Sequence, residues 1–66
     1  MNSVGESLRI ARRIKGMTME EAGAELGFTR RAVGSWERGE RQPHPVHERI
    51  IKEATARWLR EAAGLA

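Results

Sequence analysis

The chain has 66 residues, which limits it to one small domain, and it contains no cysteine, which excludes disulfide frameworks and thiolate metal sites. Its 12 basic residues outnumber its 9 acidic ones, and all but two of the bases are arginines, the residue best suited to phosphate. Nucleic acid is therefore the first partner to consider.

The first predicted helix spans residues 4–15. Apolar residues recur on one side of it at helical spacing, at Val4, Leu8 and Ala11. Ser3 can cap its start, and Gly16 can end it. We expect Arg9 and Arg13 on its outer face.

The second predicted helix spans residues 19–26. Thr18 and Glu21 have the spacing of a capping box, in which each side chain accepts a hydrogen bond from a free backbone N–H group, and Gly27 can end the helix. The stretch 17–28 is acidic, and the segments on both sides of it are basic.

The third predicted helix begins at the cap Thr29 and ends at Arg38, before Gly39. Val33 and Trp36 place apolar groups on one side of this helix. The polar residues expected to face outward are Arg30, Arg31 and Ser35.

Two prolines prevent regular helix in the segment 40–45, and a C-terminal helix or pair of short helices follows over residues 45–64. Its apolar stripe comprises Ile50, Ile51, Ala54, Trp58, Leu59 and Ala62. His44 and His47 lie three residues apart, but no third ligand is evident, so no metal site is expected.

These elements predict an all-α fold, a compact bundle of four to five helices in a single domain over residues 1–66. The short turn inside the segment 19–38 requires two steeply crossing helices, as in helix-turn-helix units. Gly27 permits a positive φ in this turn, and Gly23 leaves no side chain where the helices approach. The wedge between the helices would be filled by Leu26, Val33 and Trp36.

The segment 17–39 together with Pro43 resembles the Cro and phage-repressor (XRE-like) helix-turn-helix family, with a lambda-repressor-like fold, and the resemblance extends without gaps from Val4 to Pro43. Two positions depart from the family pattern. Met19 stands where the family commonly has a glutamine that touches phosphate, and the pair Ala22-Gly23 replaces a larger Leu-Ala pair.

The resemblance implies roles for individual residues. A glutamate in the tract 36–39 pairs with an arginine of the first helix, which here predicts an ion pair between Glu37 and Arg12. The base contacts implied are Thr29, Arg30, Arg31 and Ser35. The phosphate contacts expected are Arg9, Arg13, Thr18, Met19, Arg38 and Arg41.

The apolar residues near the C-terminus have two interpretations. They can pack on the bundle, or they can form a dimer interface of Trp58, Leu59 and Ala62, because the first half of the last helix should suffice to cover the core. A symmetric homodimer would place two recognition helices about 34–36 Å apart and make the operator an inverted repeat.

The function predicted is a sequence-specific double-stranded DNA-binding regulator, a repressor of the phage or prophage Cro kind. The alternative is a protein-binding antitoxin or antirepressor that acts through its C-terminal helix. Enzymatic activity is not expected, because a catalytic constellation and a phosphate-cradling glycine loop are both missing. We expect no cofactor and no small-molecule ligand. We expect no membrane partner, because no apolar stretch approaches the roughly 20 residues that span a bilayer. The expected location is the cytoplasm of a bacterial cell, at the nucleoid.

Overall fold

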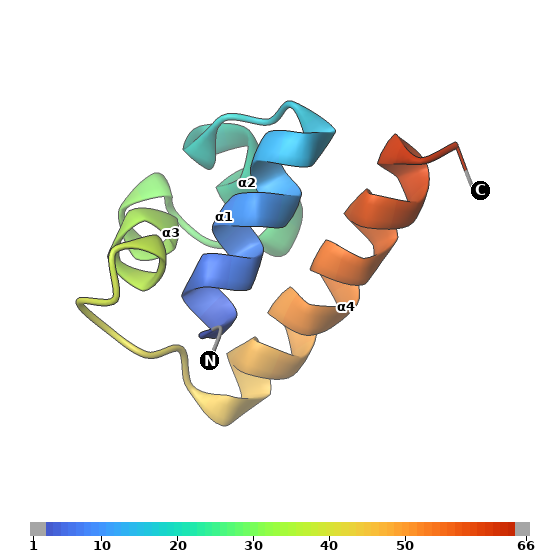
Figure 1. Ribbon diagram of the computed structural model, residues 1–66. Helices are drawn as coiled ribbons and strands as arrows, with labels where there is room; N and C mark the ends of the chain where they lie inside the picture. The colour runs from blue at the N-terminus through green and yellow to red at the C-terminus, as the bar shows by residue number, and fades with distance from the viewer. Residues whose placement is uncertain (1–2, 65–66) are drawn as a thin grey trace.

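The computed structural model describes residues 3–64 as four helices joined by short connections (Figure 1). The helices are α1 (Val4–Lys15), α2 (Met19–Leu26), α3 (Arg30–Glu37) and α4 (Pro45–Ala62). No strand forms within the described residues, so the predicted all-α fold is confirmed. No helix in this part of the chain combines the length and apolar character needed to cross a membrane.

Helices α1 and α4 lie side by side and run in the same direction, with α3 on the other side of α1 (Figure 1). At their C-terminal ends, the Nζ atom of Lys15 is 3.4 Å from a carboxylate oxygen of Glu61. At their N-terminal ends, Val4 and Glu48 line one cavity. Helix α1 is therefore the central element, in contact with α3 on one side and α4 on the other.

Local capping explains why α1 and α2 have their observed bounds. The Ser3 hydroxyl accepts a hydrogen bond from the Glu6 N–H group at 3.1 Å, and Gly16 ends α1 in the left-handed conformation with φ of +77°. At the start of α2, Thr18 and Glu21 form the full capping box, with N···O distances of 2.8 and 3.0 Å. The predicted bounds of both helices are confirmed.

The turn between α2 and α3 depends on two glycines. Gly27 has a φ of +82°, which residues with a Cβ atom rarely adopt. A Cβ atom on Gly23 would lie 2.7 Å from the carbonyl oxygen of Phe28, so the backbone of the turn lies directly against α2. This close approach sets the steep crossing of α2 and α3.

Helix α3 ends at Glu37, and Arg38 is its C-cap, one residue earlier than predicted. The connection that follows ends at His44, whose Nδ1 atom accepts a hydrogen bond from the N–H group of Val46 at 3.2 Å. Pro45 occupies the first turn of α4, where its missing N–H group costs nothing. His44 is thus an N-cap residue.

Helix α4 is one continuous helix of 18 residues, which decides between the two predicted arrangements. The core that it covers consists of Leu8, Ala11, Ala22, Leu26, Val33, Trp36, Ile51, Ala54 and Trp58. Of the two interpretations of Trp58, packing on the bundle is confirmed and a place in a dimer interface is wrong, because its side chain is completely buried inside the protomer. The physical reason is the shared direction of α1 and α4, which brings the second half of α4 onto the core as well. Leu59 and Ala62 remain exposed.

Candidate nucleic-acid interface

The two sides of α3 differ sharply in chemistry. One side is buried and consists of Val33, Trp36 and Glu37, with Gly34 buried beside them. Trp36 also packs edge-on against Phe28, with ring centroids 5.0 Å apart. The other side is exposed and bears arginines. The Thr29 hydroxyl caps the amino end of the helix by accepting a hydrogen bond from the N–H group of Ala32 at 3.1 Å. The helix is therefore anchored along one side and presents the other to a partner.

A buried ion pair fixes α3 to α1. Arg12 Nε and Nη2 donate to the two carboxylate oxygens of Glu37 at 2.7 and 2.9 Å, and both residues are 8% exposed. The hydrogen bonds that Arg12 donates to Glu37 raise the pKa of Arg12, so the guanidinium stays charged although burial opposes this. The bidentate geometry compensates each buried charge. These are the two residues that the family resemblance pairs.

Arg12 also ties the start of the helix-turn-helix unit to α1. Its Nη1 atom donates to the carbonyl oxygen of Met17 at 2.9 Å, just before α2 begins. One guanidinium thus holds three segments: its own helix, the connection that leads into α2 and the end of α3. The relative position of α2 and α3 is fixed by this side chain as well as by the turn between them.

Gly5 is a second contact between α1 and α3, and it was not among the residues predicted from the sequence. A Cβ atom here would lie 1.8 Å from the carbonyl oxygen of Trp36, so α1 and the end of α3 touch backbone to backbone. Gly5 lies three residues before Leu8 and seven before Arg12, on the same inward stripe of α1. A glycine on an inward helical stripe was the signal that could have identified this contact.

Two surface grooves flank the exposed side of α3, and Arg31 lies between them because it lines both. One groove is formed by Met19, Arg30, Arg31, Gly34 and Arg38. The other is formed by Phe28, Thr29, Arg31, Ala32, Ser35, Trp36, Glu40, Arg41 and His47. The four residues implied as base contacts therefore lie in or beside these grooves, with Arg30 and Arg31 exposed and Ser35 half-buried.

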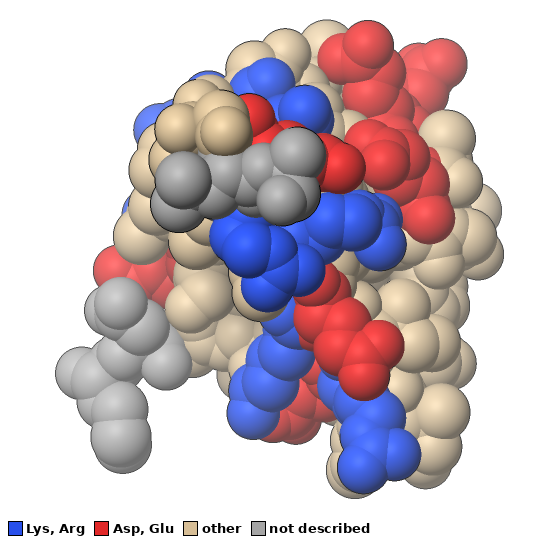
Figure 2. Space-filling model, turned by 90° about the vertical axis from the view of Figure 1, so that its right-hand side faces the viewer, with Lys and Arg blue, Asp and Glu red and all other residues tan. Residues whose placement is uncertain are grey.

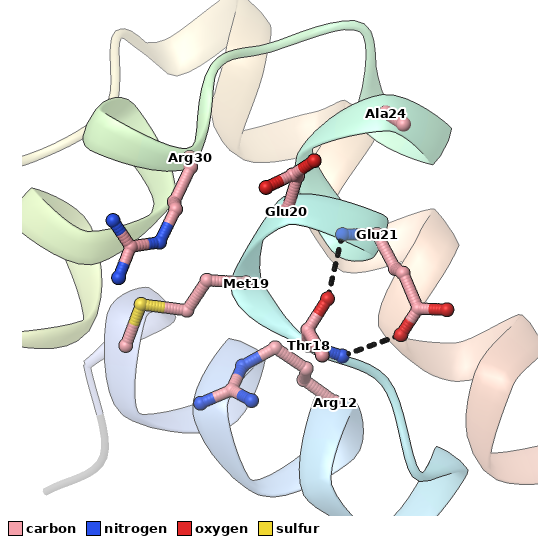
Figure 3. A pocket seen from close by; sticks show the side chains of 7 residues that line it. All are labelled: Arg12, Thr18, Met19, Glu20, Glu21, Ala24 and Arg30. Carbon is pink, nitrogen blue, oxygen red and sulfur yellow. Dashed lines mark hydrogen bonds between the residues drawn. The ribbon is translucent and has the colours of Figure 1, made fainter.

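A further hollow lies at the amino end of α2 and is shown in Figure 3. The side chains of Met19 and Arg30 lie on one side of it, and Met19 is half-buried against the core. The carboxylate of Glu21 is engaged in the capping box with Thr18. The capping box leaves the N–H group of Met19, in the first turn of α2, without an intrahelical partner.

The remaining arginines implied as phosphate contacts have different environments. Arg9 is half-buried and Arg13 is exposed, both on α1. Arg38 is exposed and forms a bidentate pair with Glu40, with N···O distances of 2.9 and 3.2 Å. Hydrogen bonding within this pair raises the pKa of Arg38 and lowers that of Glu40. Arg41 lines the groove beside Ser35.

The side of the molecule formed by α4 has a different charge pattern. Figure 2 views the molecule from this side and shows basic and acidic side chains next to one another across it. Glu48 and Lys52 pair along the helix at 3.1 Å, and Arg57 lies 3.8 Å from Glu25 of α2. Such mixed charge is typical of a solvated face, whereas Arg30 and Arg31 on the exposed side of α3 form no ion pair within the described residues. The charge pattern therefore distinguishes α3 as the side suited to a polyanion.

Comparison with known proteins agrees with this arrangement. A family model described as helix-turn-helix matches residues 8–46, more than half of the chain. No curated protein and no solved structure matches the chain. The matched region begins on α1, includes α2, α3 and the connection after α3, and ends at the start of α4. The chain therefore belongs to the XRE/Cro-like helix-turn-helix family and is a DNA-binding transcription regulator.

Proposed function

We propose that the protein is a sequence-specific repressor of the phage-repressor kind, which reads an operator through the major groove with α3 and acts by occupying that operator. The observation that carries this proposal is the exposed row of arginines on α3, opposite the side that Arg12 and Glu37 hold in place. An α-helix fits the major groove, and arginine there favours guanine through its O6 and N7 atoms.

The base contacts in this proposal come from the amino-terminal half of α3 and from the groove beside it. They are Thr29, Arg30, Arg31 and Ser35. The Thr29 hydroxyl accepts from the N–H group of Ala32, and its own O–H is expected to donate to a base or phosphate oxygen. Arg30 and Arg31 are the specificity-determining pair, because each has an exposed guanidinium and neither has a paired carboxylate among the described residues.

Phosphate contacts on either side of α3 would fix the register of the complex. The amino end of α2, at Thr18 and Met19, offers a free N–H group and the positive end of the helix dipole. Arg41 lies beyond the other end of α3 and can reach the next phosphates. Arg9 and Arg13 of α1 are further candidates on the rim of the interface.

We further propose that the protein binds its operator as a homodimer through an apolar seam between α1 and α4, formed by Ile10, Ile14 and Leu59. Ser7 of α1 and Lys52 of α4 line one cavity between the two helices. Ile14 lies seven residues after Ser7 on α1, and Leu59 lies seven residues after Lys52 on α4. Because the helices run in the same direction, this spacing returns both side chains to the same seam.

The three seam residues are 42%, 57% and 41% exposed, which is high for isoleucine and leucine at neighbouring positions. A second copy is the favoured occupant because one α3 contacts only one half-site, whereas two copies related by a two-fold axis contact an inverted repeat. Ala62 lies three residues after Leu59 and extends the seam.

The DNA-binding proposal is tested by selecting bound sequences from a random duplex library. We expect the wild-type protein to enrich an inverted repeat, and we expect Arg30→Ala and Arg31→Ala to relax defined positions in it. Arg60→Ala, which removes an exposed arginine from α4, is the matched control and should leave the motif unchanged. Affinity should fall by orders of magnitude between about 50 and 200 mM salt. Absence of any enriched sequence, with a flat salt profile, would instead favour a protein-binding regulator.

The seam proposal is tested by sedimentation equilibrium of Leu59→Glu and Ile50→Glu. The two residues are equally exposed, at 41%, but they lie nine residues apart and so project from opposite sides of α4. We expect Leu59→Glu alone to abolish dimerisation and to weaken binding to the inverted repeat. If both variants dimerise like the wild type, or if the wild type is monomeric at tens of micromolar and binds single half-sites, the seam is not a dimer interface.

A further inference from the structure

The exposed side of α3 carries an arginine that the amino-terminal recognition residues do not include. Arg31, Gly34 and Arg38 follow at spacings of three and four residues, so they form one stripe along the helix. Arg31 and Arg38 are exposed, whereas Gly34 between them is buried. Gly34 in the middle of the stripe costs about 1 kcal/mol of helix stability relative to alanine, which calls for a compensating role.

The guanidinium of Arg38 lies directly over Gly34. A Cβ atom on Gly34 would be 2.9 Å from Arg38 Nη1, so any side chain at position 34 would compete with the guanidinium for the same space. Side chains of a helix point back towards its amino end, and Arg38 follows this rule. Its charged group therefore lies within the groove formed with Met19, Arg30 and Arg31, about one helical turn closer to the recognition residues than its own Cα atom.

Glu40 holds this guanidinium by one edge and leaves another edge free. It accepts hydrogen bonds from Nε at 2.9 Å and from Nη2 at 3.2 Å. A guanidinium has five N–H donors, so the two donors of Nη1 and the second donor of Nη2 remain available. Donors on Nη1 and Nη2 form a fork that can bind the O6 and N7 atoms of guanine.

We propose that Arg38 reads a guanine in the major groove opposite Gly34, and that Glu40 is a positioning residue that orients its guanidinium. This inference rests on the proposed function and replaces the phosphate contact that the family resemblance implied for Arg38. The carboxylate of Glu40 cancels the net charge of the pair, which weakens a contact with phosphate. A bidentate hydrogen bond to a base does not need that net charge.

The test is quantitative binding to the selected operator and to duplexes with each half-site position changed in turn. We expect Arg38→Ala to remove the preference for guanine at one further position in each half-site, a loss of about ten- to a hundredfold in discrimination. Gly34→Ala keeps Arg38 and Glu40 but displaces the guanidinium, so it should lose the same preference while it remains folded by circular dichroism.

Glu40→Gln separates positioning from charge. We expect this variant to bind non-specific DNA more tightly than the wild type, because it gains a net positive charge, and to discriminate less at the Arg38 position. If Arg38→Ala weakens all duplexes equally and lowers the salt slope by about 1, Arg38 contacts phosphate and the inference is wrong. A wild-type protein that enriches no sequence overturns both this inference and the proposed function. A motif that Arg38→Ala retains unchanged overturns this inference alone.

Discussion

Replacing Gly5 by alanine tests the contact that joins α1 to α3. The added Cβ atom would lie 1.8 Å from the carbonyl oxygen of Trp36 and 2.6 Å from its carbon, and neither backbone atom can move without its helix. The helices must separate by about 1.2 Å to restore a contact of 3.0 Å. This movement also stretches the hydrogen bonds between Arg12 and Glu37, which now measure 2.7 and 2.9 Å.

The expected loss of stability can be set against an internal control. Over-packing of this kind costs about 3 kcal/mol, and alanine returns at most about 1 kcal/mol of helix propensity, so Gly5→Ala should lose about 2 kcal/mol. In a domain of this size, such a loss lowers the melting temperature by about 8–16 °C. In Gly34→Ala, the new Cβ atom meets only the mobile end of Arg38, so the same substitution should leave stability equal or up to about 1 kcal/mol higher.

Thermal and urea denaturation of the two variants, followed by far-ultraviolet circular dichroism, measures this difference directly. The chemistry of the change is identical in both variants, so intrinsic propensity cannot explain a difference in sign. If Gly5→Ala proves as stable as Gly34→Ala, the backbone of α1 does not contact that of α3, and the explanation given for the anchoring of α3 must be abandoned.

Three further predictions concern the ion pairs and the core. Arg12→Ala and Glu37→Ala should each lower the free energy of unfolding by about 3–5 kcal/mol, because the partner is left as an uncompensated buried charge. Chemical denaturation of the two single variants and the double variant should show a coupling energy above about 1 kcal/mol, and strict additivity would contradict a direct pair. The buried Nε1 atom of Trp58 has no hydrogen-bond partner among the described residues, so Trp58→Phe removes an unsatisfied donor. This variant should lose less than about 1 kcal/mol of unfolding free energy, whereas Trp58→Ala should lose about 3–5 kcal/mol. Equal losses in the two variants would refute this prediction. The hydrogen bond from Arg38 lowers the pKa of Glu40, so the stabilising pair is fully present above the ordinary carboxyl pKa and is lost as the pH falls through the lowered value. A carbon-13 NMR titration of Glu40 should show a lowered midpoint that Arg38→Ala returns to normal. Identical midpoints in the wild type and the variant would exclude the pair in solution.

The sequence by itself determined the bounds of α1 and α2 and the turn that joins α2 to α3. Helix ends depend on nearest neighbours in the chain, such as the hydroxyl of Thr18 and the left-handed conformation of Gly27, so local patterns were sufficient to predict them. The exposed arginines of α3 could be identified for the same reason, because the positions of Val33 and Trp36 already define which side of the helix is buried.

Only the tertiary structure decided how distant segments meet. The direction of α4 relative to α1 buries Trp58 completely and leaves Leu59 exposed, although both residues belong to one apolar stripe. A stripe wider than the contact cannot reveal which of its members the neighbouring helix will cover. The contact of Gly5 with Trp36 joins residues 31 positions apart, and the position of Arg38 over Gly34 depends on the side-chain conformation that Glu40 selects. Such contacts depend on crossing angles and rotamers, which the periodicity of a sequence does not encode.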